Sequence, residues 1–448
     1  MAESDREEAE AGPDDRPASF RDALAVGPFR RLWAGQLLSI VGDQVARVAL
    51  TVLVFDRTAS AALTALTYAL TFLPDLVAGP LLSGLADRFP RRATMVVTDV
   101  ARAVLVAVMA VPGMPLPALA TLLVAVQMLA APFLAARSAI LPHLLDGDRY
   151  VAGAALIGTT YQSAQVLGFA LGGPLVAAVG VSPALGLDAA SFLVSAAVLR
   201  LGVPEQRAEG TAGSTTARST TAGAGFRAWA AAVREAVARI GQGARIVGRD
   251  ARLRSLIALA CVSAFVVTVE GLAAPYAAEL GAGTVAVGVL LAANPLGAAV
   301  GIVALTRLVA PEARVRLLGP LAVGSCVPLV ASALDPPLAA VVGLWMLSGL
   351  CCAYQVPANA AFVAAVPDAH RGQAFGLAVT ALRVTQGLGV LVSGLVAQQS
   401  SPSVAVAISG ALGVVVALGV ALAWTRARGA RPAGAGRQGT TTGTSDAA

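Results

Sequence analysis

Residues 84–96 read GLADRFPRRATMV, a charged stretch that lies between two apolar segments. It holds four of the chain's few charged side chains: Asp87, Arg88, Arg91 and Arg92. Of the 448 residues, 57% are hydrophobic and 13% are charged, whereas soluble domains carry about 25% charged residues. Because long windows contain almost only Ala, Val, Leu and Gly, the composition indicates a protein that crosses a membrane several times.

Apolar segments of membrane-spanning length recur along the chain, since a helix needs about 20 apolar residues to cross the hydrocarbon core. They cover residues 32–55, 63–86, 93–111, 116–137, 152–179, 183–202, 253–277, 285–309, 315–334, 337–358, 373–398 and 403–425. Strands of a membrane β-barrel would be about ten residues long and would alternate in polarity. The sequence therefore predicts an all-α membrane protein with twelve transmembrane helices.

The placement of arginine predicts the orientation. With the N-terminus inside the cell, the short cytoplasmic loops hold Arg88, Arg91, Arg92, Arg149, Arg307, Arg314, Arg316 and Arg371, whereas the external loops hold only Arg57. The positive-inside rule then predicts a multi-pass protein of the cytoplasmic membrane with both termini in the cytoplasm. The net charge of +6 could suggest nucleic acid as a partner. Because the arginines cluster at the ends of apolar segments, we expect the membrane surface and no nucleic acid.

Two stretches of different composition divide the chain. Residues 203–225 are rich in Gly, Ser, Thr and Ala, which predicts a flexible linker. Residues 226–250 alternate apolar positions and arginines at helical spacing, which predicts a basic amphipathic helix on the membrane surface. We expect an acidic disordered tail and interfacial lead-in at 1–28, a six-helix bundle at 29–202, the linker at 203–250, a second six-helix bundle at 251–426 and a disordered tail at 427–448.

The two halves resemble each other in sequence. The chain reads QVLGFALGGPLVA from Gln165 and QGLGVLVSGLVAQ from Gln386. The residues that recur in register are Gln165/Gln386, Leu167/Leu388, Gly168/Gly389 and Gly173/Gly394. A parallel repeat of this kind predicts two pseudo-symmetric six-helix bundles, the plan of one large class of transporters.

In this topology GLADRFPRR is the cytoplasmic loop between the second and third spans. It resembles the signature loop of the major facilitator superfamily, approximately G-x-L-a-D-r-x-G-R-[RK], with Pro90 where the family more often has glycine. The matching residues are Gly84, Leu85, Asp87, Arg88, Arg91 and Arg92. The resemblance implies the major facilitator fold, alternating access and a gating role for this loop. The alternative is that its arginines serve only to keep the loop inside the cell.

Three further stretches resemble the bacterial exporter subgroup that includes enterobactin exporters and macrolide efflux proteins. They are FRRLWAGQLLSIVGDQVARVAL at 29–50, LDAASFLVSAAVLRL at 187–201 and VPDAHRGQAFGL at 366–377. This resemblance implies export of a small, amphipathic molecule, such as a drug, siderophore or metabolite, by proton antiport. It also implies a monomer whose partners are small-molecule cargo, protons and the lipid bilayer.

The fifth span carries GFALGGP at 168–174, which partly matches the G-x-x-x-G-P-x-x-G-G pattern of antiporters in the superfamily. Gly173 and Pro174 fit the pattern, Gly168 is displaced by one position, and alanines replace the final glycines. A helix with small residues and a kink suits packing against the other half, which favours export but would also suit a uniporter. We expect this helix and the eleventh span, which holds Arg383, to lie between the halves.

Ionisable side chains inside the spans are the strongest functional candidates, because each costs about 2.5–3.5 kcal/mol on insertion scales. Asp43 and Arg47 are four residues apart in the first span and can pair on one helix face. Asp99 and Arg102 are three residues apart in the third span, where we expect a structural pair. Glu270 in the seventh span has no partner nearby in the sequence.

The family plan has the first, fourth, seventh and tenth spans line a central cavity, so Asp43, Arg47 and Glu270 would face it. Burial favours the protonated form of a carboxylate, which then exchanges protons near neutral pH. We therefore predict proton coupling at Asp43, Glu270 and Asp75, with structural pairing as the alternative. Arg383 could pair with Asp75 or Asp43.

Cargo binding is predicted at Arg47 and at polar residues of the tenth span, Tyr354, Gln355 and Asn359. Other polar side chains in spans more often form hydrogen bonds between helices. These are Tyr68, Gln127, Tyr161, Gln162, Gln165 and Asn294.

Signatures of an enzyme are absent from the sequence. Its two histidines, His143 and His370, are far apart in the chain, and no G-x-x-x-x-G-K-[ST] stretch for a nucleotide occurs. We therefore expect no enzyme activity, no metal site and no cofactor other than the proton gradient. The alternatives are a proton-coupled importer or facilitator of a small metabolite and, in another class, a non-transporting membrane sensor on the same fold.

Overall fold

The computed structural model describes residues 18–74, 77–78, 89–205, 241–367 and 370–429. The helices of the N-terminal half are α2 (Phe20–Ala25), α3 (Gly27–Thr58), α4 (Ala61–Ala69), α7 (Arg91–Met109), α8 (Leu116–Leu144), α9 (Gly147–Val179) and α10 (Val181–Gly202). Those of the C-terminal half are α12 (Ala251–Cys261), α13 (Ser263–Val266), α14 (Thr268–Gly271), α15 (Ala273–Glu279), α16 (Thr284–Leu308), α17 (Pro311–Arg316), α18 (Leu318–Val330), η1 (Ala331–Leu334), α19 (Leu338–Cys351), η2 (Cys352–Tyr354), α20 (Gln355–Ala365), α21 (Arg371–Gln399) and α22 (Pro402–Gly429). The predicted all-α class is confirmed.

Within the described ranges, 9 helical segments are long and apolar enough to cross a membrane. The other predicted spans coincide with α4, with α7 and with α18 followed by η1. The α4 span extends into residues outside the described ranges, and α7 contains the charged pair Asp99 and Arg102. The fold is therefore that of a membrane protein with many spans, and the number twelve stays a prediction.

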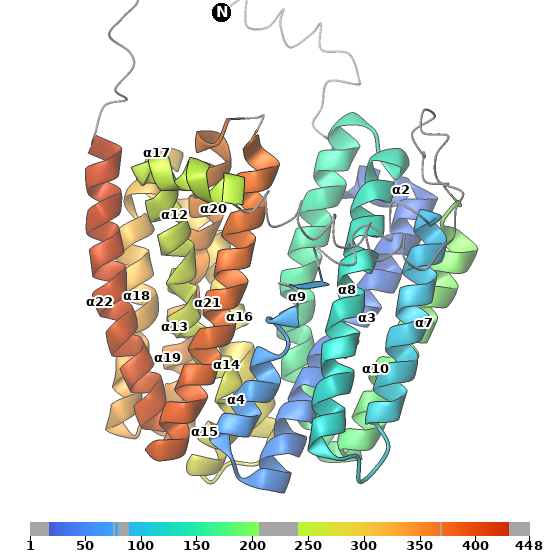
Figure 1. Cartoon of the computed structure of the whole chain (residues 1–448), viewed down its shortest axis with the longest axis horizontal. Coiled ribbons are helices and arrows are strands. Elements are labelled where there is room, and N and C mark those ends of the chain that lie inside the picture. Colours follow the sequence, from blue (N-terminus) through green and yellow to red (C-terminus); the bar gives the residue numbers. More distant parts are fainter. Residues whose placement is uncertain (1–17, 75–76, 79–88, 206–240, 368–369, 430–448) are drawn as a thin grey trace, which may run out of the picture.

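Figure 1 shows two groups of upright helices, with α3, α7, α8, α9 and α10 in one group and α12 to α22 in the other. α4 leaves the end of α3 and packs against α21 of the second group. We name the two ends of the molecule after helices that lie there. The α2 end carries α2 and the last turns of α22, and the α15 end lies opposite. The arginine pattern predicts that the α2 end faces the cytoplasm.

The two groups meet at the α15 end through glycines of the sequence repeat. A Cβ atom added to Gly173 of α9 would lie 2.8 Å from the Cα atom of Gly288 in α16. The repeat partner Gly394 of α21 packs in the same way against Ala65 of α4. Because only small residues let helix backbones approach so closely, these two glycines determine where the halves touch.

The next repeat pair positions the same helices inside their own groups. Gly168 of α9 packs against Gln44 of α3, and Gly389 of α21 packs against Ala264 of α13. The fifth predicted span thus lies on the first, and the eleventh lies on the seventh. The contacts follow the sequence repeat, as two related bundles require.

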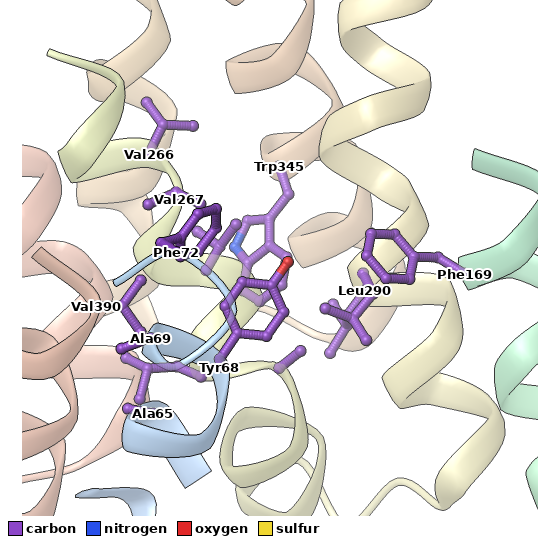
Figure 2. Packing of buried hydrophobic residues seen from close by; sticks show 14 of the residues in the cluster. Ala65, Tyr68, Ala69, Phe72, Phe169, Val266, Val267, Leu290, Trp345 and Val390 are labelled. Atoms are coloured by element: carbon purple, nitrogen blue, oxygen red, sulfur yellow. The ribbon is translucent and has the colours of Figure 1, made fainter. Parts of the chain in front are cut away.

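Figure 2 shows the apolar packing around both inter-bundle contacts. Phe169 of α9 lies beside Leu290 of α16, and Ala69 of α4 lies near Val390 of α21. All four side chains are buried in one cluster that extends through both bundles. The α15 end is therefore closed by packed side chains in this conformation.

Two basic residues of the signature stretch hold the start of α7 inside its own bundle. Arg91 donates a hydrogen bond of 2.8 Å to the carbonyl oxygen of Ala139 in α8. Arg92 forms an ion pair of 2.7 Å with Glu205, which follows α10. Of the other candidate residues, Asp75, Gly84, Asp87 and Arg88 lie outside the described ranges.

The predicted interfacial lead-in begins with the short helix α2. Ser19 caps this helix, and its hydrogen bonds to Asp22 hold the pKa of that carboxyl below its usual value. Of the linker, residues 241–249 are described and helical, and Val247 is buried in the apolar cluster. The predictions for residues 1–17, 206–240 and 430–448 lie outside the described ranges.

Candidate functional site

A cavity of about 540 Å³ lies between the two bundles. Its walls come mainly from α9, α12, α16, α20 and α21, and α3 contributes Arg47. The lining residues of α21 belong to the half of the helix that begins at the α2 end, so the cavity lies between the middle of the molecule and that end. The predicted fourth span, α8, contributes no lining residue among those described.

Glu270 lies in the wall of this cavity on a broken stretch of the seventh predicted span. That span consists of the separate short helices α12, α13, α14 and α15, and α14 carries the carboxylate. Glu270 is 7% exposed and accepts a hydrogen bond from the hydroxyl group of Tyr68 in α4. The bond joins the two bundles, because α4 belongs to the N-terminal half of the chain.

Two guanidinium groups share the cavity with Glu270. Arg47 of α3 and Arg383 of α21 both line it, and both act electrostatically on the carboxylate. Arg383 also lies 5.5 Å above the ring of Phe72, within the range of a cation–π contact. Arg383 was predicted to pair with Asp75 or Asp43; Asp75 lies outside the described residues, and Asp43 is paired with Arg102.

The polar residues of the tenth predicted span divide into two groups. Gln355 and Asn359 of α20 line the cavity, as a cargo-binding role requires. Tyr354 does not line it: its side chain is fully buried, and its hydroxyl group donates a 2.9 Å hydrogen bond to the carbonyl oxygen of Leu259. Tyr354 therefore joins the tenth span to α12, at the 3₁₀ segment η2 that separates α19 from α20.

Asp43 lies elsewhere than predicted. Instead of pairing with Arg47 along α3, it forms an ion pair of 3.1 Å with Arg102 of α7. It faces a separate, small cavity within the N-terminal bundle. Asp99 accepts a hydrogen bond from Ser195 of α10, and Arg102 acts on it electrostatically while making its direct contact with Asp43.

Several polar side chains that were expected to join helices line the cavity instead: Tyr161, Gln162, Gln165 and Asn294. The repeat-related glutamines Gln165 and Gln386 both belong to this lining. The side-chain nitrogen of Asn294 is buried without a hydrogen-bond partner in the described part of the chain. Gln127 matches the prediction, since it donates to the carbonyl oxygen of Thr71.

Aromatic residues of the cavity were missed by reasoning from the sequence. Phe72, Phe362 and Phe375 line it together with aliphatic side chains. An aromatic residue in an apolar span carries no signal of its own, because lipid, core and cavity all accept it. The walls therefore combine apolar surface with amides and with charges of both signs.

Comparison with known proteins identifies a family whose model matches this chain. A family model described as Major Facilitator Superfamily matches residues 32–329 and 256–445. An uncharacterized MFS-type transporter, YfiS of Bacillus subtilis (strain 168), is 31% identical over 169 residues, which cover 38% of this chain. The matched region spans 40% of that relative's length.

Solved transporters share the fold at low sequence identity. A bacterial homologue of the human lysosomal transporter Spinster, inward-facing and unoccupied, has a TM-score of 0.58 at 14% identity over 89% of this chain and 94% of its own. A POT family transporter in complex with a thioalcohol-conjugated peptide has a TM-score of 0.67 at 12% identity, covering 89% and 96%. The nucleoside transporter NupG has a TM-score of 0.63 at 14% identity, covering 89% and 100%.

Proposed function

The chain belongs to the Major Facilitator Superfamily, and from this premise we propose that it exports small amphipathic molecules across the cytoplasmic membrane in exchange for protons. Family membership makes it a secondary membrane transporter with several membrane-spanning helices. Export, proton coupling and the cargo class are the content of the proposal.

The observation that carries the proposal is the position of Glu270. It is a buried carboxylate in the wall of the inter-bundle cavity, it accepts a hydrogen bond from Tyr68, and it faces Arg47 and Arg383. A buried carboxylate in a membrane span is costly unless it has a function or a partner. This one has partners from both bundles, so a change in its charge acts on the contact between them.

Proton exchange at this site follows from competition for one carboxylate. In its ionised form, Glu270 can accept a hydrogen bond or a positive charge from a bound cargo. A proton on the same oxygen removes that attraction, so cargo and proton exclude each other. A transporter that binds either cargo or a proton, and that opens to one side of the membrane at a time, exchanges cargo for protons.

The cavity walls support an amphipathic cargo. Aromatic and aliphatic side chains supply apolar surface, and the amides of Gln355, Asn359 and Asn294 can orient a polar group. The cavity volume of about 540 Å³ is within the usual range of roughly 300–1,000 Å³ for small-molecule sites.

Export is supported by the first of two observations, and the second is compatible with it. The stretches 29–50, 187–201 and 366–377 resemble a subgroup of bacterial exporters. The cavity lies toward the α2 end, which the arginine pattern predicts to face the cytoplasm, while packed glycines close the α15 end. Cargo from the cytoplasm would enter this conformation, and release would require the opposite one.

The test uses inverted membrane vesicles whose lumen is acidified. Wild-type protein should drive ethidium, a rhodamine dye or a macrolide into the lumen and move protons out, which a luminal pH reporter detects. Glu270→Gln should abolish the cargo-linked proton flux. Glu312→Gln is the matched control, because Glu312 is exposed on α17, and this variant should behave as wild type.

A Glu270→Gln variant that couples normally would refute the role of this carboxylate. Accumulation of a metabolite only in right-side-out vesicles would show an importer and overturn the direction.

A further inference from the structure

A second group of ionisable residues lies inside the N-terminal bundle, away from the cargo cavity. Asp43 of α3, Asp99 and Arg102 of α7, and Asp188 of α10 come together there. Asp99 is 0% exposed, Asp188 is 2% exposed and Arg102 is 6% exposed. One guanidinium group thus lies among three carboxylates, and it is directly paired only with Asp43, whose side chain is 26% exposed.

The hydrogen bonds of this cluster leave two carboxylate oxygens without partners. Ser195 donates to Asp99 Oδ2 at 2.7 Å, and Ser191 donates to Asp188 Oδ1 at 3.3 Å. Asp99 Oδ1 and Asp188 Oδ2 are buried and accept no hydrogen bond from any described residue. An ionised carboxylate oxygen left in this way is strongly unfavourable, whereas a protonated one is not.

Arg102 compensates only part of the negative charge. Its Nη2 atom contacts both oxygens of Asp43, at 3.3 and 3.1 Å, and its guanidinium carbon lies 4.2 Å above the ring of Phe192. The charged groups that act on Asp188 and Asp99 are Asp43 and this same arginine. Helix α8 contributes Leu123, Val126 and Gln127 to this region, and none of these side chains is charged. Carboxylates so close together do not all ionise, because each charge disfavours the next.

A small cavity of about 20 Å³ adjoins the cluster at Asp43 and Asp188. Its other polar lining residues are Arg47, Thr71 and Gln127, and the rest of its lining is apolar. About 10–15 Å³ is enough to hold one water molecule when polar groups surround it. A metal ion is a poorer occupant, since the described residues contain no group of three or more ligands arranged to hold one.

We propose that Asp188 and Asp99, beside the Asp43–Arg102 ion pair, form a second proton-binding site, in which at least one proton is held inside the N-terminal bundle and exchanges through the small cavity that Asp188 lines. Protonation transfers a proton from a hydronium ion to Asp188 Oδ2 and leaves a neutral water molecule, so no other reactant is needed. The site deepens the proposed function, on whose proton coupling its role in transport rests. Its protonation can be measured without any cargo.

Arg47 links this site to the cargo cavity. It lines both cavities and interacts electrostatically with Asp43, which lines the small cavity, and with Glu270, which lines the cargo cavity. Arg47 is attracted to both carboxylates. A proton in the cluster weakens the attraction on one side, so Arg47 shifts its interaction toward Glu270. A proton in the cluster therefore strengthens the attraction between Arg47 and Glu270, and this attraction couples the two sites.

The test is an infrared pH titration of the purified full-length protein in lipid nanodiscs, without cargo. Wild-type protein should show the carbonyl band of protonated carboxyl groups at neutral pH. Asp188→Asn should lower the intensity of this band by the contribution of one carboxyl group. Asp99→Asn should lower its intensity or shift its frequency. Asp56→Asn is the matched control, because Asp56 is an exposed carboxylate of α3, and it should leave the band unchanged.

The outcomes are separable from the role of Glu270. Glu270→Gln should affect a different component of the band, so failure at one site is not failure at the other. If Asp188→Asn folds poorly, Asp188→Glu retains the carboxyl group and should shift its carbonyl frequency. A band unchanged in the Asp188 and Asp99 variants would overturn the proposal. Loss of the band when sodium chloride replaces choline chloride at constant pH would also overturn it, in favour of a sodium site.

Discussion

The close approach of Gly173 to Gly288 makes the balance between conformations sensitive to one methyl group. In Gly173→Ala, the new Cβ atom would lie 2.8 Å from Gly288 Cα and 2.9 Å from both Gly288 N and Val285 O. Ordinary van der Waals contact begins at 3.4 Å, so the two helices must separate by about 0.6 Å. The obstructing atoms belong to the backbone and cannot rotate away. Overpacking of this kind costs about 1–3 kcal/mol.

This cost falls on the conformation closed at the α15 end. A state in which α9 and α16 have separated at that end does not contain the clash. The ratio of open to closed molecules should therefore rise about 5- to 150-fold in Gly173→Ala. Because the bundles themselves need not rearrange, the variant should remain folded and monodisperse.

Distances between spin labels measure this shift. Labels at Asp56, near the end of α3, and at Ser400, after α21, report the separation of the bundles at the α15 end, and both positions are exposed. The four native cysteines are replaced first. Gly158→Ala is the matched control on the same helix, since nothing lies within 4 Å of its added Cβ atom. If Gly173→Ala and Gly158→Ala give the same distance distribution as the parent, the reasoning is refuted.

Three further contacts can be tested by substitution. Tyr68→Phe removes the hydrogen-bond donor to the buried cavity carboxylate and should lower cargo-linked proton flux about 10-fold or more, whereas an unchanged flux in inverted vesicles would contradict the role of that bond. Tyr354→Phe removes the hydrogen bond to the carbonyl oxygen of Leu259 and should lower the free energy of unfolding by about 1 kcal/mol. The KM for cargo should not change. A changed KM would indicate that Tyr354 contacts the cargo. A double-mutant cycle of Arg92→Gln and Glu205→Gln should give a coupling energy below about 1 kcal/mol that declines as the salt concentration rises. The reason is that the two side chains are 27% and 49% exposed. A larger coupling energy that does not depend on salt would indicate a buried contact.

The features that could be predicted from the sequence are those that depend on composition and periodicity. Apolar segments of spanning length predict helices because an unpaired backbone group is too costly in lipid. The repeat at Gly168 and Gly389 predicts related contacts because a missing side chain allows the same close approach in each half. Both expectations agree with the packing of α9 on α3 and of α21 on α13.

The candidate site was predicted only in part. Four of the candidates line the cavity: Arg47, Glu270, Gln355 and Asn359. They could be selected from the sequence because polar and charged residues are unusual within an apolar span. The amides that line the cavity could not be distinguished from those that join helices. An amide forms a hydrogen bond between helices only where the neighbouring helix offers a partner. Gln127 has such a partner in the carbonyl oxygen of Thr71, whereas Gln165 lines the cavity.

The sequence by itself determined that the chain is an all-α membrane protein, that its halves are related and that charges lie within its spans. Only the tertiary structure decided which charges meet. Spacing along α3 allowed Asp43 to pair with Arg47, but Arg102 of α7 contacts Asp43 instead. This leaves Arg47 on the wall of the cargo cavity with Glu270. The reason is physical: Coulomb attraction depends on distance in space, and neighbouring helices bring residues far apart in the chain closer than one helical turn does.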